Sequence, residues 1–274
     1  MPTTVPAKQR YFEGLSDYQT AFLRYYPCPQ LFAVISWGCA ATGWIASILS
    51  RHPDIYCAHA ANHVWNVLGQ CEKLDGVRYL RVLGSQASSR VAAGDVHGVD
   101  RRHIPELRRV FEDRFNAAVV VREPMARLRS QLGVFHQFER QEHWDLAYLE
   151  ELIPATGVIL PSSGYCWRFF VHAANMLNAI LEEVEVGRVY RAEDLTRNTD
   201  ILCEFVDEIT RGKVSPDAQW LRSSVEIPHL NPHTQGLPPM EFDDWQVDVI
   251  RKVVRPRAWE LYERMGYPAA GFVS

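Results

Sequence analysis

The fold of this chain is decided near its amino terminus by LFAVIS at residues 31–36, WGCAA at 37–41 and TGWIASILSR at 42–51. The first segment is an unbroken apolar run, which is typical of a strand buried on both faces of a parallel sheet. In the third segment the apolar residues share one helical face, and Pro53 ends the pattern. We therefore predict a strand, a short loop and a helix in direct succession.

The same alternation continues along the chain. Further strands are predicted at 55–57, 118–121 and 187–190, and helices at about 101–115, 124–138, 164–186 and 199–211. Residues 58–96 show no clear period. Strands that alternate with helices predict one α/β domain over 1–274, with a central parallel sheet and helices on both faces. We expect a helical extension at 1–29 and a carboxyl-terminal helix at 240–267.

Composition excludes several classes of protein. With 47% hydrophobic and 23% charged residues, the 274-residue chain has the balance of a soluble globular domain. Its net charge of -4 argues against nucleic-acid binding, and no apolar run is long enough to enter a membrane stably. The six cysteines show no metal-binding or CxxC spacing, and no signal peptide is visible. We expect a cytoplasmic protein without a metal; its oligomeric state is not predicted.

The loop after the first strand has the glycine skeleton of a phosphate-binding loop, with Gly38 and Gly43 five residues apart. A helix that follows such a loop presents backbone N–H groups and the positive end of its dipole to an anion. A nucleoside triphosphatase would carry Lys and then Ser or Thr after the second glycine, but Trp44 and Ile45 stand there. The strand–loop–helix is thus P-loop-like without the residues for ATP or GTP hydrolysis.

Two landmarks resemble the sulfotransferases that use 3′-phosphoadenosine 5′-phosphosulfate, in particular the bacterial and carbohydrate types. One is the loop from Cys39 to Trp44, followed by His-Pro-Asp-Ile at 52–55. The other is Arg122 at the end of a strand, with Ser130 eight residues later on the next helix. A guanidinium and a hydroxyl with that spacing can both reach one phosphate.

The resemblance implies a set of donor-binding residues. Arg122 and Ser130 would bind the 3′-phosphate, and the loop would bind the 5′-phosphosulfate through Gly38, Cys39, Ala40, Ala41, Thr42, Gly43 and Trp44. Two of these have equally ordinary structural roles. Arg122 could cap a helix or join a surface ion pair, and Trp44 could pack in the core instead of against the adenine.

Later segments extend the resemblance to about residue 267. Arg191-Ala-Glu193-Asp194-Leu195 is similar to the family's acidic segment after a strand, where carboxylates more often hold structure than ligand. The residues around His229 and Asn231, and the stretch 255–267, are similar to the closing segment of the family.

Sulfuryl transfer needs a base that accepts the proton of the acceptor hydroxyl. His97 is the candidate, because it lies 25 residues before Arg122, close to the place of a Lys-x-His pair in many family members. An imidazole titrates near neutral pH and suits this role, although most histidines in loops are simply bonded to local backbone. His59 and His63 are the alternatives.

The chain departs from the family pattern at the loop. Cys39 stands where the family has Lys or Arg, Ala41 replaces a Gly, Gly43 replaces a Thr, and Asp95 stands where the Lys of Lys-x-His is expected. A thiol cannot supply the positive charge that stabilises the leaving phosphate. We expect that charge to come from another residue, such as Arg90, or from the helix amino terminus alone.

The acceptor is expected to be a hydroxyl of a glycan or of a small-molecule natural product. Its walls would come from 58–96, 140–165 and 215–240, with aromatic surface from Trp65, Trp144, Tyr148, Tyr165, Trp167 and Trp220. Two other functions stay open at this point. One is a small-molecule kinase with a degenerate phosphate loop, and the other is a non-catalytic member of the fold that binds nucleotide or glycan.

Overall fold

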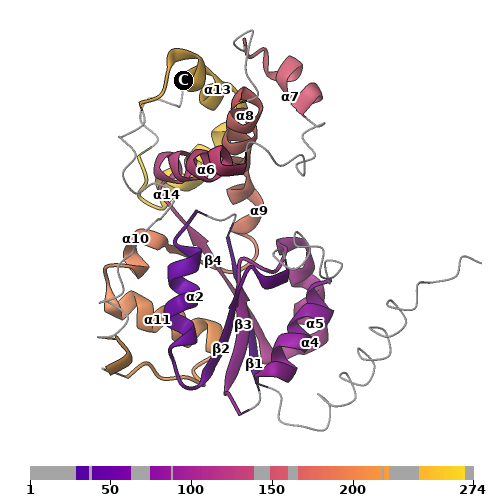
Figure 1. The fold of residues 1–274 in the computed structure, drawn as a ribbon, viewed down its shortest axis with the longest axis vertical. Coiled ribbons are helices and arrows are strands. Elements are labelled where there is room, and N and C mark those ends of the chain that lie inside the picture. The colour runs from indigo at the N-terminus through magenta and orange to yellow at the C-terminus, as the bar shows by residue number, and fades with distance from the viewer. Residues whose placement is uncertain are drawn as a thin grey trace, which may run out of the picture.

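The computed structural model describes residues 29–36, 39–62, 75–87, 89–138, 149–159, 166–217, 219–221 and 241–268. A five-stranded sheet occupies one half of the molecule, with helices on both faces, and further helices gather beyond one end of the strands (Figure 1). The strands are β1 (Gln30–Ile35), β2 (Ile55–His59), β3 (Ala92–Val96), β4 (Phe115–Val121) and β5 (Arg188–Arg191). All neighbouring pairs are parallel, which confirms the predicted α/β class.

The helices divide between the two faces of the sheet and the group beyond its end (Figure 1). One face packs against a hydrophobic cluster to which α2 (Thr42–Ser50), α10 (Ala192–Leu195) and α11 (Thr199–Thr210) contribute. The other face packs against a cluster to which α4 (Gly76–Gln86) and α5 (Ile104–Phe111) contribute. The group beyond the end contains α6 (Pro124–Phe138), α7 (Leu149–Thr156), α8 (Cys166–Met176), α13 (Asp244–Val253) and α14 (Pro256–Arg264), and α9 (Ile180–Glu183) leads back from it to β5. None of the helices in the described ranges combines the length and apolar character needed to cross a lipid bilayer.

The strand order positions the candidate site. The order is β2-β3-β1-β4-β5, so β1 and β4 are neighbours in the middle of the sheet. After β1 the chain continues toward β2 at one edge of the sheet, and after β4 it continues toward β5 at the other edge. Ligands of open α/β sheets bind at such a switch point, beyond the carboxyl ends of the strands. The residues that follow Ile35 and Val121 are therefore in the place where a ligand is expected.

The predicted β1 is buried along its whole length because its alternate side chains enter two different cores. Leu31, Ala33 and Ile35 belong to the cluster on the α4 and α5 side. Phe32 and Val34 belong to the cluster on the α2 and α11 side. This two-sided burial explains why the strand is an unbroken apolar run with no polar residue between its ends.

One strand, β3, lies in the stretch that shows no clear period in the sequence. Its residues are AAGDV, and Val96 alone among them has the β-branched or aromatic side chain that marks most strands. The small residues are needed because β3 lies between β1 and β2, and a side chain at Gly94 would collide with Phe32. Packing against the neighbouring strand thus selected residues with little strand propensity of their own.

Three predicted helices are divided in the structure. The helix expected at 101–115 consists of a 3₁₀ turn at Arg101–His103, α5 and a second 3₁₀ turn at Glu112–Arg114, and Phe115 already begins β4. The helix expected at 164–186 consists of α8, a 3₁₀ turn at Leu177–Ala179 and α9. The carboxyl-terminal segment expected at 240–267 contains α13 and α14, which are separated at Val254 and Arg255. Pro256 occupies the first position of α14, and a proline disfavours helical backbone at the residue before it.

Substitution of Gly94 by Ala tests the role of β3. A Cβ at this position would lie 2.2 Å from the carbonyl oxygen of Phe32, which is backbone of the central strand. We expect Gly94→Ala to lower the free energy of unfolding by about 3 kcal/mol or more, measured by urea denaturation. Gly43→Ala is the matched control, because the nearest atom to its Cβ would be His59 Cε1 at 3.6 Å. Equal stability of the two variants would contradict this role of β3.

Candidate functional site

The loop that follows β1 has left-handed backbone at two positions that carry a Cβ atom. Cys39 and Ala41 adopt left-handed conformations, with φ of 54° and 60°. Such φ angles cost a residue with a Cβ roughly 1 kcal/mol each, so the surrounding structure must hold them in place. Ala41 stands where the resemblance implies Gly, and it is also the N-cap of α2 without offering a side-chain cap. Two positions of this loop therefore have the backbone conformation that glycine usually supplies.

Two residues predicted to bind a phosphate meet at Cys39. Arg122 follows β4, and its Nη1 donates a hydrogen bond of 2.9 Å to the backbone carbonyl of Cys39. The Cys39 thiol is hydrogen-bonded to the buried Ser130 of α6. Burial raises the pKa of the thiol, and the Ser130 bond and the charges of Arg127 and Arg122 oppose that rise. The loop and the start of α6 thus form one polar cluster.

The amino terminus of α6 is held by carboxylates. Glu123 accepts a hydrogen bond of 3.0 Å from the N–H of Met125, which caps the helix. The N–H of Glu123 donates to Glu193 Oε1 at 3.0 Å, and the Tyr267 hydroxyl donates to Glu193 Oε2 at 2.7 Å. The acidic segment after β5 and the closing segment of the chain therefore meet at the helix that carries Ser130. Glu193 holds structure here, as the sequence suggested for its carboxylates.

His59 ends β2 beside the first turn of α2. Its Nε2 lies 3.1 Å from Thr42 Oγ1. Partial burial of the ring lowers the pKa of His59, although the residue remains accessible to solvent. The imidazole is thus available as a neutral partner that orients the Thr42 hydroxyl in the loop.

His97 follows β3 directly and is held firmly in an uncommon conformation. Its φ is 71°, its N–H donates to the carbonyl of Val34 at 2.9 Å, and its Nδ1 bonds the carbonyl of Ser36. A carbonyl only accepts hydrogen bonds, so Nδ1 of the neutral ring carries the proton. The same tautomer leaves Nε2 unprotonated and able to accept a proton, which is the arrangement that a general base needs.

Asp95 belongs to β3 and lies near the carboxyl ends of β2 and β3, where His59 and His97 are found. It is fully buried, and Tyr79 donates a hydrogen bond of 2.5 Å to its Oδ2. The backbone N–H groups of Ala60, Ala61 and Gly98 also face the carboxylate. Burial is the largest influence and raises the pKa of Asp95 to about 7. The position where the resemblance implies a lysine is therefore an interior anchor that joins the ends of β2 and β3.

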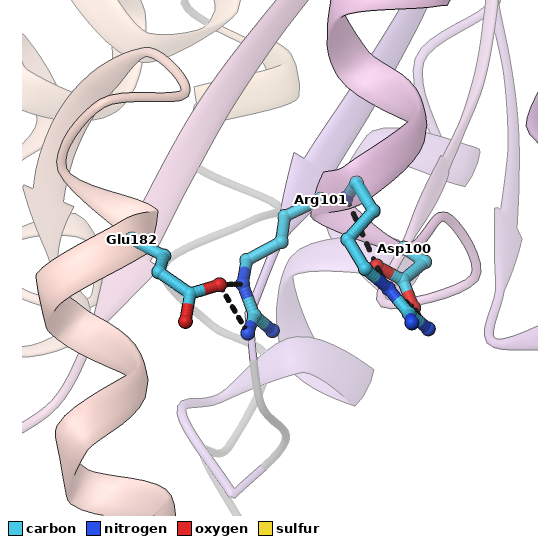
Figure 2. Close-up of polar contacts among 4 residues, drawn as sticks. Asp100, Arg101 and Glu182 are labelled. Carbon is cyan, nitrogen blue, oxygen red and sulfur yellow. Dashed lines mark hydrogen bonds and ion pairs between the residues drawn. The ribbon is translucent and has the colours of Figure 1, made fainter.

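The far end of the His97 loop is tied to α9. Asp100 accepts from the N–H of Arg102 at 2.9 Å and so caps the short 3₁₀ turn at Arg101–His103. Arg101 Nε donates to Glu182 Oε2 at 2.7 Å, and Figure 2 shows the two side chains approaching from separate elements. Although the pair is partly exposed, it joins the loop of the candidate base to the segment that leads into β5.

Arg90 was the sequence candidate for the missing positive charge, and this assignment is wrong. It precedes β3, at the end of the sheet opposite the loops. Its guanidinium bonds the backbone carbonyls of His52 and Pro53. It therefore holds the turn before β2.

Two tryptophans expected at the ligand site lie in the core. Trp220 is buried, its indole N–H donates to the carbonyl of Ile48 at 3.0 Å, and it packs edge-on against His52. It is therefore not a wall of an acceptor pocket, because its ring fills space behind α2. Trp44 is only 9% exposed and belongs to the same cluster, which favours its core role over adenine stacking. Gly38, His63, His229, Asn231, Trp65, Trp144, Tyr148 and Tyr165 lie outside the described residues.

Arg127 is the residue at this site that the sequence reasoning did not single out. It lies between Arg122 and Ser130, and helical spacing puts it on the same face of α6 as Ser130. Only 2% of the residue is exposed, and Nε and Nη2 of its guanidinium have no hydrogen-bond partner among the described residues. The i, i+3 relation to Ser130 was the available signal.

Comparison with known proteins adds one structural likeness. No family model matches the chain, and no curated protein matches it. A crystal structure of a sulfotransferase from Alicyclobacillus acidocaldarius is similar, with a TM-score of 0.49 and 15% sequence identity over 90% of this chain and 99% of that one. The strand order and register described above define the fold.

The buried Asp95 predicts a particular pH dependence of stability. The folded protein keeps the Asp95 proton up to about pH 7, whereas an exposed carboxyl releases it near the ordinary value of 3.8. Ionisation is thus unfavourable in the folded state, and stability from this group declines as pH rises through that window. We expect the free energy of unfolding of Asp95→Asn, relative to that of the wild type, to rise by about 2–3 kcal/mol from pH 5 to pH 8, measured by urea denaturation. Parallel pH profiles for the two proteins would refute this role.

Proposed function

We propose that this protein transfers a sulfuryl group from 3′-phosphoadenosine 5′-phosphosulfate to a hydroxyl of a glycan or small-molecule acceptor. One observation carries the proposal. Arg122 and Ser130, which the resemblance to sulfotransferases implies as ligands of the 3′-phosphate, both bond Cys39 of the loop that it implies for the 5′-phosphosulfate. Residues 83 positions apart in the chain are thereby joined at the switch point of the sheet.

The residues present fit a bisphosphorylated donor. The left-handed backbone at Cys39 and Ala41 turns the loop around the start of α2, which has neither a side-chain cap nor an acidic residue in its first turn. A helix amino terminus of this kind favours an anion. Arg122 uses one of its five N–H donors on the Cys39 carbonyl. The others suit a phosphate, because guanidinium geometry matches phosphate oxygens.

A phosphoryl-transfer function is disfavoured by the same helix. The two positions after Gly43, where a nucleotide kinase carries its phosphate-binding Lys and its hydroxyl, are Trp44 and Ile45. Both side chains are buried in the core cluster beneath α2. They therefore hold the helix against the sheet instead of contacting a nucleotide.

The two histidines suggest different roles in the reaction. The donor supplies an activated sulfuryl group, and in-line attack forms a bond from the acceptor oxygen to sulfur while the bond from sulfur to the 5′-phosphate oxygen breaks. His97 accepts the hydroxyl proton at Nε2, because Nδ1 is engaged by the Ser36 carbonyl. His59 orients Thr42, whose hydroxyl and neighbouring backbone N–H groups stabilise the departing phosphate.

Substitution of Arg122 tests the donor site. We expect the wild type to be stabilised against heat by 3′-phosphoadenosine 5′-phosphate more than by ATP with magnesium. Arg122→Ala should weaken bisphosphate binding by roughly 2–4 kcal/mol, because a charged phosphate contact in a partly buried site is lost. Calorimetric titration measures this change.

Arg211→Ala is the matched control for Arg122→Ala. Arg211 likewise donates to a backbone carbonyl, that of Phe115 at 3.2 Å, but Phe115 begins β4, whereas Arg122 follows the other end of that strand. Its loss should leave bisphosphate affinity unchanged. Stabilisation of the wild type by ATP with magnesium alone, or equal affinity in Arg122→Ala, would overturn the proposal.

Substitution of His97 tests the chemical step. We expect His97→Ala and His97→Asn to lower sulfate transfer by about 10²–10⁴-fold, since general-base catalysis is lost, while bisphosphate affinity is retained. Asn tolerates the left-handed backbone, so this variant separates catalysis from strain. Transfer to a panel of glycan and small-molecule hydroxyls is measured with labelled donor. Bisphosphate binding by the wild type without transfer to any acceptor would instead favour a binding-only protein.

A further inference from the structure

The loop lacks a cation of its own, yet a buried positive charge lies close to it. Arg127 belongs to α6, on the same helical face as Ser130, and Ser130 contacts the Cys39 thiol. Arg127 also acts electrostatically on that thiol, with a larger effect than Arg122. Its guanidinium is therefore beneath the loop, in the interior, where Coulomb interactions are screened less than at the surface.

The charge of Arg127 is only partly compensated by its surroundings. It is hydrogen-bonded to Tyr262, but Nε and Nη2 have no acceptor among the described residues. One acid near it is Glu183 of α9, which is 1% exposed and whose two carboxylate oxygens also have no hydrogen-bond partner among the described residues. Burial raises the pKa of Glu183 to about 7, although Arg127 and Arg101 oppose this rise.

An arginine stays charged at all physiological pH values, whereas Glu183 is partly protonated near neutrality. Glu183 therefore compensates the charge of Arg127 only in part near neutral pH. Burial of an incompletely paired ion is unfavourable, and an anion bound at the loop would relieve it. Anion binding at the loop would therefore explain why the interior contains such a charge.

We propose that Arg127 supplies, from beneath the loop, the positive charge that Cys39 cannot provide for binding the donor's anionic group. This inference rests on the proposed function and deepens it. Arg127 acts on the anion through the loop and Ser130, and is thus a positioning residue of the donor site. The position of the charge, on α6 instead of in the loop, accounts for the tolerance of a cysteine at residue 39.

The test compares three variants for binding of inorganic pyrophosphate and of 3′-phosphoadenosine 5′-phosphate by calorimetry. Arg127→Met paired with Glu183→Gln removes both interior charges together, so the acid is not left alone in the core. We expect at least about ten-fold weaker binding of both anions. Arg127→Lys should retain most of the affinity. Arg129→Met is the control, because the Arg129 guanidinium of the same helix stacks on Phe242, with Cζ 4.9 Å from the ring centroid. This variant should bind both anions as the wild type does.

Rescue and thiol chemistry separate an electrostatic role from a structural one. Adding Cys39→Lys to the uncharged pair should restore anion affinity, because the charge returns in the loop. Alkylation of Cys39 by iodoacetamide at pH 8.5, followed by peptide mass spectrometry, should be slower in the uncharged pair, since the thiolate is the nucleophile and Arg127 stabilises it. Circular dichroism verifies that each variant is folded.

The outcomes distinguish this inference from the proposed function. If the wild type binds pyrophosphate but not the bisphosphate, the donor assignment fails. The role of Arg127 would still be supported if the uncharged pair lost pyrophosphate binding and alkylated more slowly. If a folded uncharged pair binds both anions like the wild type and alkylates at the same rate, the inference is overturned. Failure of Cys39→Lys to restore binding would also overturn it, because the charge would then not be what the loop lacks.

Discussion

The hydrogen bond from Arg122 to the carbonyl of Cys39 joins the ends of the two central strands, and the candidate site depends on it. It holds the loop after β1 in a left-handed conformation that its Cys and Ala residues do not favour by themselves. It also places the start of α6 against that loop, where Ser130 bonds the Cys39 thiol. One guanidinium thus organises the backbone, the thiol and the hydroxyl of the site.

The remaining contacts extend this arrangement from the interior. Asp95 holds the ends of β2 and β3 together, so that His59 at the end of β2 and His97 after β3 are fixed in position. Two adjacent acids of α9 face different arginines, with Glu182 bonded to Arg101 in the His97 loop and Glu183 near Arg127 in α6. The short helix α9 therefore connects the loop of His97 with α6. In the proposed site, the buried Arg127 takes the place of the loop cation that the resemblance implies at residue 39.

The sequence predicts the parts of this structure whose signals are local. β1 is a long apolar run, and the spacing of Arg122 and Ser130 follows from one strand end and one helix. β3 escaped prediction because Gly94 is selected by contact with Phe32, a residue of another strand. The burial of Trp220 and the interior charge of Arg127 depend on which segments fold over them. Such tertiary effects leave no periodic pattern in the sequence, so arginines as different as Arg90 and Arg127 look alike there.

A crystal structure of the protein with 3′-phosphoadenosine 5′-phosphate tests the central claim most directly. The account predicts the 3′-phosphate against Arg122 and Ser130, and the 5′-phosphate at the amino terminus of α2 beside Thr42. It also predicts that Nε2 of His97 faces the side of the 5′-phosphate from which an acceptor would approach. A bisphosphate bound away from the ends of β1 and β4, or bound in the reverse orientation with its 3′-phosphate in the loop, would contradict it.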